Sequence, residues 1–127
     1  MDKIVIRTEN APAPFQGAPY NQAIRFGDLV FVAGQLGLRP GETTIEGDIA
    51  AQTEQVLRNL TAILDAAGSS LGNLVKTSVF LQDLDDFAAM NDVYSRYVGD
   101  RPPARSTFEV SRLPSGALVE IEAVAHV

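Results

Sequence analysis

RPPARSTFEVSRLPSGALVEIEAVAHV, at residues 101–127, contains two runs of strictly alternating side chains joined by a short turn. In the first run, Arg105 and Thr107 alternate with small or apolar residues. In the second run, Glu120 and Glu122 do the same. Alternation with a period of two residues is typical of β-strands. Because the turn contains proline and glycine, we expect the two strands to form a hairpin.

Such a hairpin would gather the polar side chains of this segment on one face. Cross-strand partners in an antiparallel pair share a face, so Arg105 and Thr107 are expected opposite the residues around Glu120 and Glu122. The simplest interpretation is a solvated sheet surface with an ordinary ion pair, which contributes little stability. The particular sequence motifs of this segment favour a functional interpretation instead.

The segment resembles the C-terminal signature of the RidA (YjgF) family, whose members are small enamine/imine deaminases. The matching sequence motifs are PARS at 103–106, EVSRLP at 109–114 and VEIEA at 119–123. A long ungapped match is more specific than a lone short motif. Further motifs similar to those of the family occur in the same order along the rest of the chain. They are PYNQA at 19–23, GDLVFVAGQ at 27–35, VKTSVFL at 75–81 and DFAAMNDVY at 86–94.

The resemblance implies roles for individual residues. An arginine at the position of Arg105 holds the substrate carboxylate in the family, and a glutamate at the position of Glu120 activates water. Tyr20, Asn91 and the backbone near Gly34 match positions that line the pocket. The implied reaction is hydrolysis of 2-enamine and 2-imine acids, such as 2-aminoacrylate, 2-iminopropanoate and 2-iminobutanoate, to 2-keto acids and ammonia. It uses no cofactor and no metal.

Two positions depart from the family pattern. Ala33 stands where many relatives have serine, and Thr107 stands where several have cysteine. Thr107 keeps its backbone N–H and remains in the expected binding set, but the shape of the pocket should differ. Arg105 suits the carboxylate because its planar fork binds two oxygens at once.

Several alternatives stay open. Glu122 lies on the same expected face as Glu120 and competes with it for the handling of water. The Arg105 clamp would equally serve a non-catalytic trimer that binds small carboxylates as a regulator, or a chaperone. Ribonuclease activity, attributed to some relatives, is disfavoured by a net charge of −6 and by a single histidine, His126. Phosphate-backbone binding requires a concentrated positive surface, so no nucleic-acid partner is expected.

Length and composition predict one domain over residues 1–127. The chain is 46% hydrophobic, which is enough to build a core, and it contains no cysteine. Disulfides, thiolate metal sites and a cysteine nucleophile are therefore excluded. The apolar run near the N-terminus is too short for a signal peptide, and no stretch reaches membrane-spanning length. We expect a cytoplasmic protein without membrane contact.

Periodicity predicts the remaining elements. Strands are expected at 3–8, 23–26, 29–33 and 75–81, and helices at 49–67 and 85–98. Asp48 is the expected N-cap of the first helix. The second helix should turn Phe87, Met90, Tyr94 and Tyr97 inward.

This order predicts a two-layer α+β domain, with a mixed sheet and two helices on one face. The resemblance implies the chorismate-mutase-like RidA fold. The other sheet face carries apolar residues such as Leu118 and Val124, so we expect other subunits to cover it. The resemblance implies a homotrimer with active sites between subunits.

Overall fold

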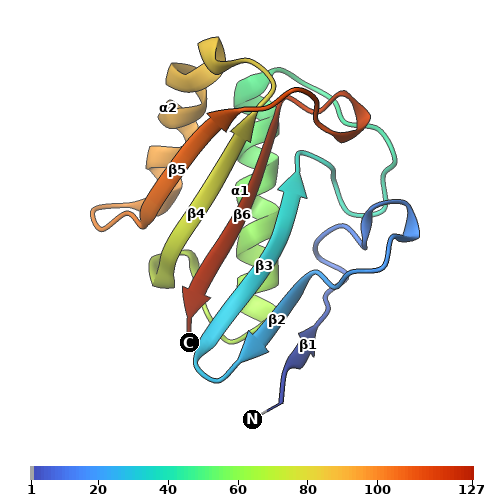
Figure 1. Ribbon diagram of the computed structural model, residues 1–127, viewed down its shortest axis with the longest axis vertical. Coiled ribbons are helices and arrows are strands. Elements are labelled where there is room, and N and C mark those ends of the chain that lie inside the picture. Colours follow the sequence, from blue (N-terminus) through green and yellow to red (C-terminus); the bar gives the residue numbers. More distant parts are fainter. Residues whose placement is uncertain (1) are drawn as a thin grey trace.

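The computed structural model describes residues 2–127 and shows a six-stranded mixed sheet with both α-helices packed on one face (Figure 1). The strands are β1 (Ile4–Ile6), β2 (Ala23–Phe26), β3 (Leu29–Leu36), β4 (Leu74–Leu81), β5 (Ala104–Glu109) and β6 (Val119–His126). The helices are α1 (Ile49–Ala66) and α2 (Phe87–Val98). The strand order β1-β2-β3-β6-β4-β5 confirms the predicted two-layer α+β fold.

Local signals place the first elements as expected. Strands β2 and β3 form a hairpin around Gly27, whose φ of 63° suits a residue without Cβ. The carboxylate of Asp48 accepts a hydrogen bond from the Ala51 N–H at 2.9 Å and caps α1. Helix α1 then buries Val56, Leu60 and its other apolar residues against the sheet.

The predicted C-terminal hairpin is wrong. Strand β5 pairs in parallel with β4, and β6 lies between β3 and β4, antiparallel to both. Helix α2 connects β4 to β5, and a strand–helix–strand crossover of this kind brings parallel neighbours together. Strand β6 buries Val119, Ile121 and Ala125 completely, which suits a central strand better than an edge.

The expected shared polar face is wrong for the same reason. Arg105 pairs in register with Thr77 and lies with it on the helix-covered face. Glu120 belongs to the opposite face, two strands away from β5. The expectation that Phe87 turns inward is also wrong, because its side chain is 39% exposed.

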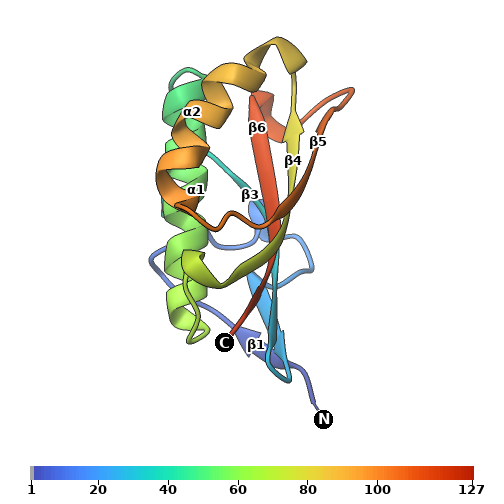
Figure 2. The same cartoon turned by 90° about the vertical axis from the view of Figure 1, so that its left-hand side faces the viewer.

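No helix within residues 2–127 covers the second face of the sheet (Figure 2). Phe31 and Phe108 project from this open face and are 45% and 55% exposed. Val124 and Phe80 lie between them, together with Glu122 and other polar groups. Large exposed apolar side chains clustered on one face are typical of an interaction surface.

Candidate active site

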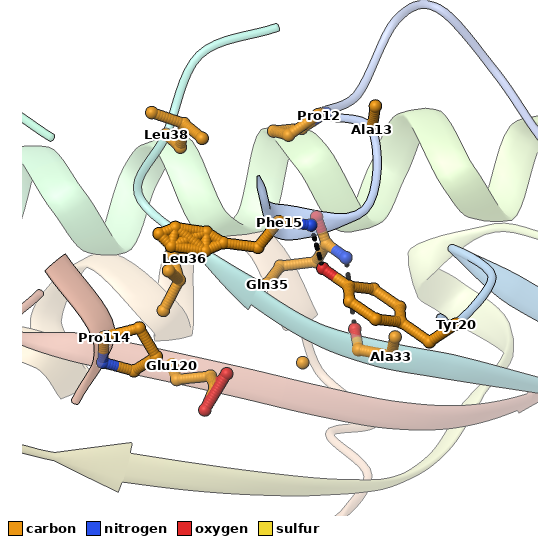
Figure 3. A pocket seen from close by; sticks show the side chains of 11 residues that line it. Pro12, Ala13, Phe15, Tyr20, Ala33, Gln35, Leu36, Leu38, Pro114 and Glu120 are labelled. Atoms are coloured by element: carbon orange, nitrogen blue, oxygen red, sulfur yellow. Dashed lines mark hydrogen bonds between the residues drawn. The ribbon is translucent and has the colours of Figure 1, made fainter. Parts of the chain in front are cut away.

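A cavity of about 280 Å³ opens where β3 and β6 lie next to the N-terminal loop (Figure 3). Its size is just below the usual range for small-molecule sites. Three of the residues expected from the sequence line it, namely Tyr20, Gly34 and Glu120. The other lining residues are Pro12, Ala13, Phe15, Ala33, Gln35, Leu36, Leu38 and Pro114.

Gly34 and Glu120 meet because β3 is irregular. The pairing of β3 with β6 shifts register between Val32 and Gln35, as in a β-bulge. The shift brings the Gly34 backbone against the Glu120 side chain. A Cβ atom on Gly34 would lie 2.7 Å from Glu120 Oε2, so only glycine leaves this carboxylate in place.

The Glu120 carboxyl group binds a proton more readily in this environment than a glutamate side chain does in water. Partial burial raises the pKa of the Glu120 carboxyl, and the nearby negative charge of Glu122 raises it further. Glu122 itself is exposed and lies in a separate, shallower hollow with Lys76 and Phe31. A half-buried carboxylate with a raised pKa is suited to exchange protons with a bound substrate.

Two other side chains around this cavity form hydrogen bonds. The Tyr20 hydroxyl accepts a hydrogen bond from the Phe15 N–H at 2.5 Å. The buried Gln35 side chain donates to the Ala33 carbonyl at 3.2 Å. Figure 3 shows the tyrosine ring across the cavity from Leu36. Tyr20 therefore fixes the loop that carries Phe15.

Two buried amide side chains hold the walls, and sequence reasoning missed both. Gln22 donates to the carbonyls of Thr8, Ala11 and Pro12 and accepts from the Thr8 N–H at 2.7 Å. Asn59, on α1, donates to the carbonyls of Leu36 and Leu38 at 3.1 and 2.8 Å. Asn59 sits among apolar residues of a buried helix face, and that contrast was the available signal.

Arg105 lies in a different place, in a shallow hollow between α2 and β5. Its guanidinium carbon is 4.8 Å from the centroid of the Tyr94 ring and 5.5 Å from that of Phe87. The Tyr94 hydroxyl and the Thr77 hydroxyl are 2.6 Å apart and fix the ring. Within residues 2–127, no carboxylate forms an ion pair with Arg105. The aromatic rings hold this cation while its N–H donors stay available.

Two buried oxygen atoms in this region have no hydrogen-bond partner in the described part of the chain. They are Asn91 Oδ1 on α2 and Thr107 Oγ1 on β5. Asn91 lines the hollow with Arg105, and Thr107 lies on the same face of β5. Buried polar atoms are nearly always paired in native proteins, so these two oxygens are exceptions in the described part of the chain.

The expected site residues thus form two groups that one copy of the chain does not bring together. Glu120, Tyr20 and Gly34 surround the cavity, whereas Arg105 and Asn91 line the hollow beside α2. Among residues 2–127, no group of three His, Asp or Glu side chains is arranged to hold a metal ion. No helix in that part of the chain is both long enough and apolar enough to cross a membrane.

Comparison with known proteins gives the family. A family model described as "Endoribonuclease L-PSP" matches residues 8–127. A RutC family protein of Pyrococcus horikoshii is 53% identical over 126 residues, which make up 98% of each chain. The chain belongs to the RidA (YjgF) family.

Other members of this family carry more specific names. Reactive Intermediate Deaminase A of Arabidopsis thaliana, a chloroplastic protein, is 46% identical over 125 residues, which are 97% of this chain and 65% of that protein. The crystal structure of E. coli TdcF with bound serine has a TM-score of 0.90, 38% identity and 98% coverage of both chains. The fold is therefore the RidA fold that the sequence predicted.

Proposed function

We propose that the chain is a deaminase that hydrolyses 2-imine and 2-enamine acids to 2-keto acids and ammonia. The observation that carries this proposal is Arg105, a ring-stacked cation with no acidic partner within residues 2–127, next to two unpaired buried oxygens. Such a group is suited to bidentate binding of a planar carboxylate. The bound serine of TdcF and the name of the Arabidopsis relative support a small amino-acid-like substrate.

The roles follow from the chemistry of each group. Arg105 neutralises and orients the carboxylate, and an enamine first gains a proton at C3 and loses one from nitrogen to become the imine. Glu120 takes a proton from water as the water oxygen bonds to C2 and the C2=N π bond opens onto nitrogen, and it passes this proton to the nitrogen. The hydroxyl proton then reaches the nitrogen through Glu120 as the C2–N bond breaks, which leaves the C2=O group of the keto acid and free ammonia. Glu120 is favoured over Glu122 for this role because it lines the cavity, whereas Glu122 is exposed. No metal or cofactor is needed, because positioning and charge placement lower the barrier.

The assembly in this proposal is a homotrimer in which Arg105 of one subunit faces Glu120 of the next. Two features support the arrangement: the separation of the two groups within one chain, and the open sheet face with Phe31 and Phe108. Closed rings built from one repeated contact join different surfaces of each subunit. Each interface would then complete one active site.

An amino-acid oxidase that generates imines in situ provides the test. The chain should accelerate release of the 2-keto acid and ammonia above the spontaneous rate. A protein that binds 2-oxobutanoate without accelerating imine loss would instead be a carboxylate-binding regulator, the alternative that Arg105 equally permits. Cleavage of RNA by the purified chain is not expected, given the net charge of −6.

A further inference from the structure

Thr77, Tyr94 and Arg105 come from three different elements and lie next to one another on the helix-covered face of the sheet. Thr77 on β4 pairs in register with Arg105 on β5, and Tyr94 belongs to α2. We propose that Tyr94, held in place by Thr77, is a positioning residue that orients the Arg105 guanidinium for a substrate carboxylate. This inference rests on the proposed function, because it concerns the carboxylate clamp of the same site.

A buried hydrogen bond fixes the tyrosine ring. The hydroxyl oxygens of Thr77 and Tyr94 are 2.6 Å apart. Thr77 is 1% exposed, and its neighbours on this face, Val79 and Ala123, are buried apolar residues that offer no side-chain partner. A buried hydroxyl without a partner is unfavourable. The hydrogen bond therefore holds one end of the ring against β4, while the backbone of α2 holds the other end.

The fixed ring in turn holds the cation. The Arg105 guanidinium carbon is 4.8 Å from the centroid of the Tyr94 ring, and the Phe87 ring is 5.5 Å away. A cation is attracted to the face of an aromatic ring, and this attraction uses none of the N–H donors of the guanidinium. A carboxylate in place of the ring would occupy those donors and neutralise the charge that the substrate requires. An aromatic support is therefore suited to an arginine that must bind a ligand.

The Tyr94 hydroxyl stays neutral beside this cation. Burial raises its pKa, whereas the hydrogen bond with Thr77 and the positive charge of Arg105 oppose that rise. The net change in pKa is upward, so the hydroxyl keeps its proton at neutral pH. A phenolate at this position would pair with the guanidinium and compete with the substrate carboxylate.

This positioning role predicts a selective effect on carboxylate ligands. The orientation of a guanidinium matters most for a ligand that accepts two N–H bonds in one plane. A keto acid offers two such oxygens, whereas its amide offers one oxygen and no charge. The ratio of the affinities for 2-oxobutanoate and 2-oxobutanamide therefore isolates the contact with Arg105 from the rest of the ligand.

Calorimetric binding of these two ligands provides the test. Thr77→Val and Tyr94→Phe each remove one hydroxyl of the shared hydrogen bond and should lower the acid-to-amide affinity ratio by about threefold or more. Tyr94→Leu removes the ring face as well and should lower the ratio by about tenfold or more. The kcat/KM for the alanine-derived imine should fall in parallel. If Tyr94→Leu does not fold, the two variants that lose only a hydroxyl decide the outcome.

Two matched controls remove hydroxyls elsewhere. Tyr97 lies one turn further along α2, donates its hydroxyl to Glu54 at 3.0 Å and does not line the hollow with Arg105. Thr61 on α1 donates to the Leu57 carbonyl at 2.8 Å. Tyr97→Phe and Thr61→Val should leave the affinity ratio unchanged. A purely structural role of Tyr94 would weaken both ligands equally and also leave the ratio unchanged, and this result would overturn the proposal.

A double variant tests whether Tyr94 acts through Arg105. Two residues that act through one contact show effects that do not add. In a chain that already carries Arg105→Ala, Tyr94→Phe should therefore change the ratio by less than about twofold. A larger effect in that chain would mean that Tyr94 contacts the ligand itself, which contradicts a positioning role.

Binding and turnover together separate this inference from the proposed function. If no imine is hydrolysed but Thr77→Val and Tyr94→Phe lower the affinity ratio, the deaminase assignment fails and the positioning role stands. If imines are hydrolysed but the Thr77 and Tyr94 variants keep the wild-type ratio, the positioning role is overturned and the deaminase assignment stands. A wild type that neither hydrolyses imines nor prefers the acid to the amide would contradict both.

Discussion

Gly34 and Glu120 lie so close that a Cβ atom on Gly34 would be 2.7 Å from Glu120 Oε2. Side-chain atoms do not approach to that distance without moving. The contact involves the end of a flexible side chain, so the fold can absorb a methyl group here by displacing the carboxylate. A substitution at Gly34 can therefore move the Glu120 carboxylate while the rest of the fold stays intact.

Gly34→Ala should reduce kcat/KM by about 100-fold, because an error of about 1 Å in positioning a reacting group costs that much. Its denaturant midpoint should change little. Gly72→Ala is the control, since a Cβ atom there meets only Ser70 Oγ at 3.6 Å. Full activity of Gly34→Ala in the oxidase-coupled assay would show that the carboxylate position does not matter.

Arg105→Ala should lower kcat/KM by tens- to hundreds-fold, since a charge-assisted bidentate contact contributes on the order of 2–4 kcal/mol. Loss of stacking on Tyr94 and Phe87 should also lower the unfolding free energy by about 1–2 kcal/mol. Arg105→Lys should not restore activity, because an ammonium group cannot reproduce the planar fork. Arg39→Ala, at an exposed position, is the control for loss of charge.

Light scattering should report a particle of about three times 13.6 kDa. Phe31→Glu, on the open sheet face, should weaken that assembly and reduce activity in parallel. A fully active monomer would contradict the shared site.

Two inactive variants should rescue each other if each site takes Arg105 and Glu120 from different subunits. After Arg105→Ala and Glu120→Gln chains are unfolded and refolded together in equal amounts, one site in about four would contain both native residues. Activity should then recover to roughly a quarter of the wild-type value. Recovery no greater than the sum of the separate variants would indicate that each chain uses its own pair.

The pH profile should report the environment of Glu120. Burial and Glu122 both raise the pKa of this carboxyl, so the acid limb of kcat/KM should lie above the ordinary glutamate value of about 4.3. Glu122→Gln removes a negative neighbour, which makes ionisation of Glu120 easier and moves the limb to lower pH. Glu42→Gln, in a distant loop, should leave it in place. A shift to higher pH in Glu122→Gln would refute the coupling.

Thr107→Val tests the unpaired hydroxyl on β5. Leaving a buried hydroxyl without a partner costs about 1–3 kcal/mol, so the isosteric valine should raise the unfolding free energy of the subunit by about 1 kcal/mol. If the hydroxyl binds substrate, kcat/KM should fall at the same time. Unchanged stability and unchanged activity together would mean that water already satisfies Thr107 Oγ1.

The layer architecture could be predicted because each signal is local. The apolar stripe of α1, the Asp48 cap and the alternation of β6 depend on residues near one another in sequence. Strand pairing depends on distant partners, and two alternating strands joined by a turn look the same whether or not they are neighbours. The insertion of β6 between β3 and β4 could therefore not be predicted from the sequence. The face of the sheet on which Arg105 lies could not be predicted for the same reason.

Some residues of the candidate site could be predicted from the sequence and others could not. The family resemblance identified Glu120, Tyr20 and Gly34, and the structure places all three around one cavity. The resemblance also implied active sites between subunits, and the separation of Arg105 and Asn91 from this cavity within one chain is compatible with that expectation. The buried amides of Gln22 and Asn59 were missed because polar residues are usually exposed. The one-domain organisation and the cytoplasmic location stay predictions.

The bulge in β3 makes the chain intolerant of length changes at one point. The residues between Val32 and Gln35 provide one extra position relative to β6. Deleting one of them would remove the extra position and leave a single residue opposite Glu122, with Gln35 still paired with Ile121. A deletion of Gly34 would thus leave Ala33, which carries a Cβ atom, as the residue beside Glu120. Homologous chains should vary in length in the loop at 39–47 instead, and a deletion library of this gene should show a sharp minimum in activity at Ala33 and Gly34.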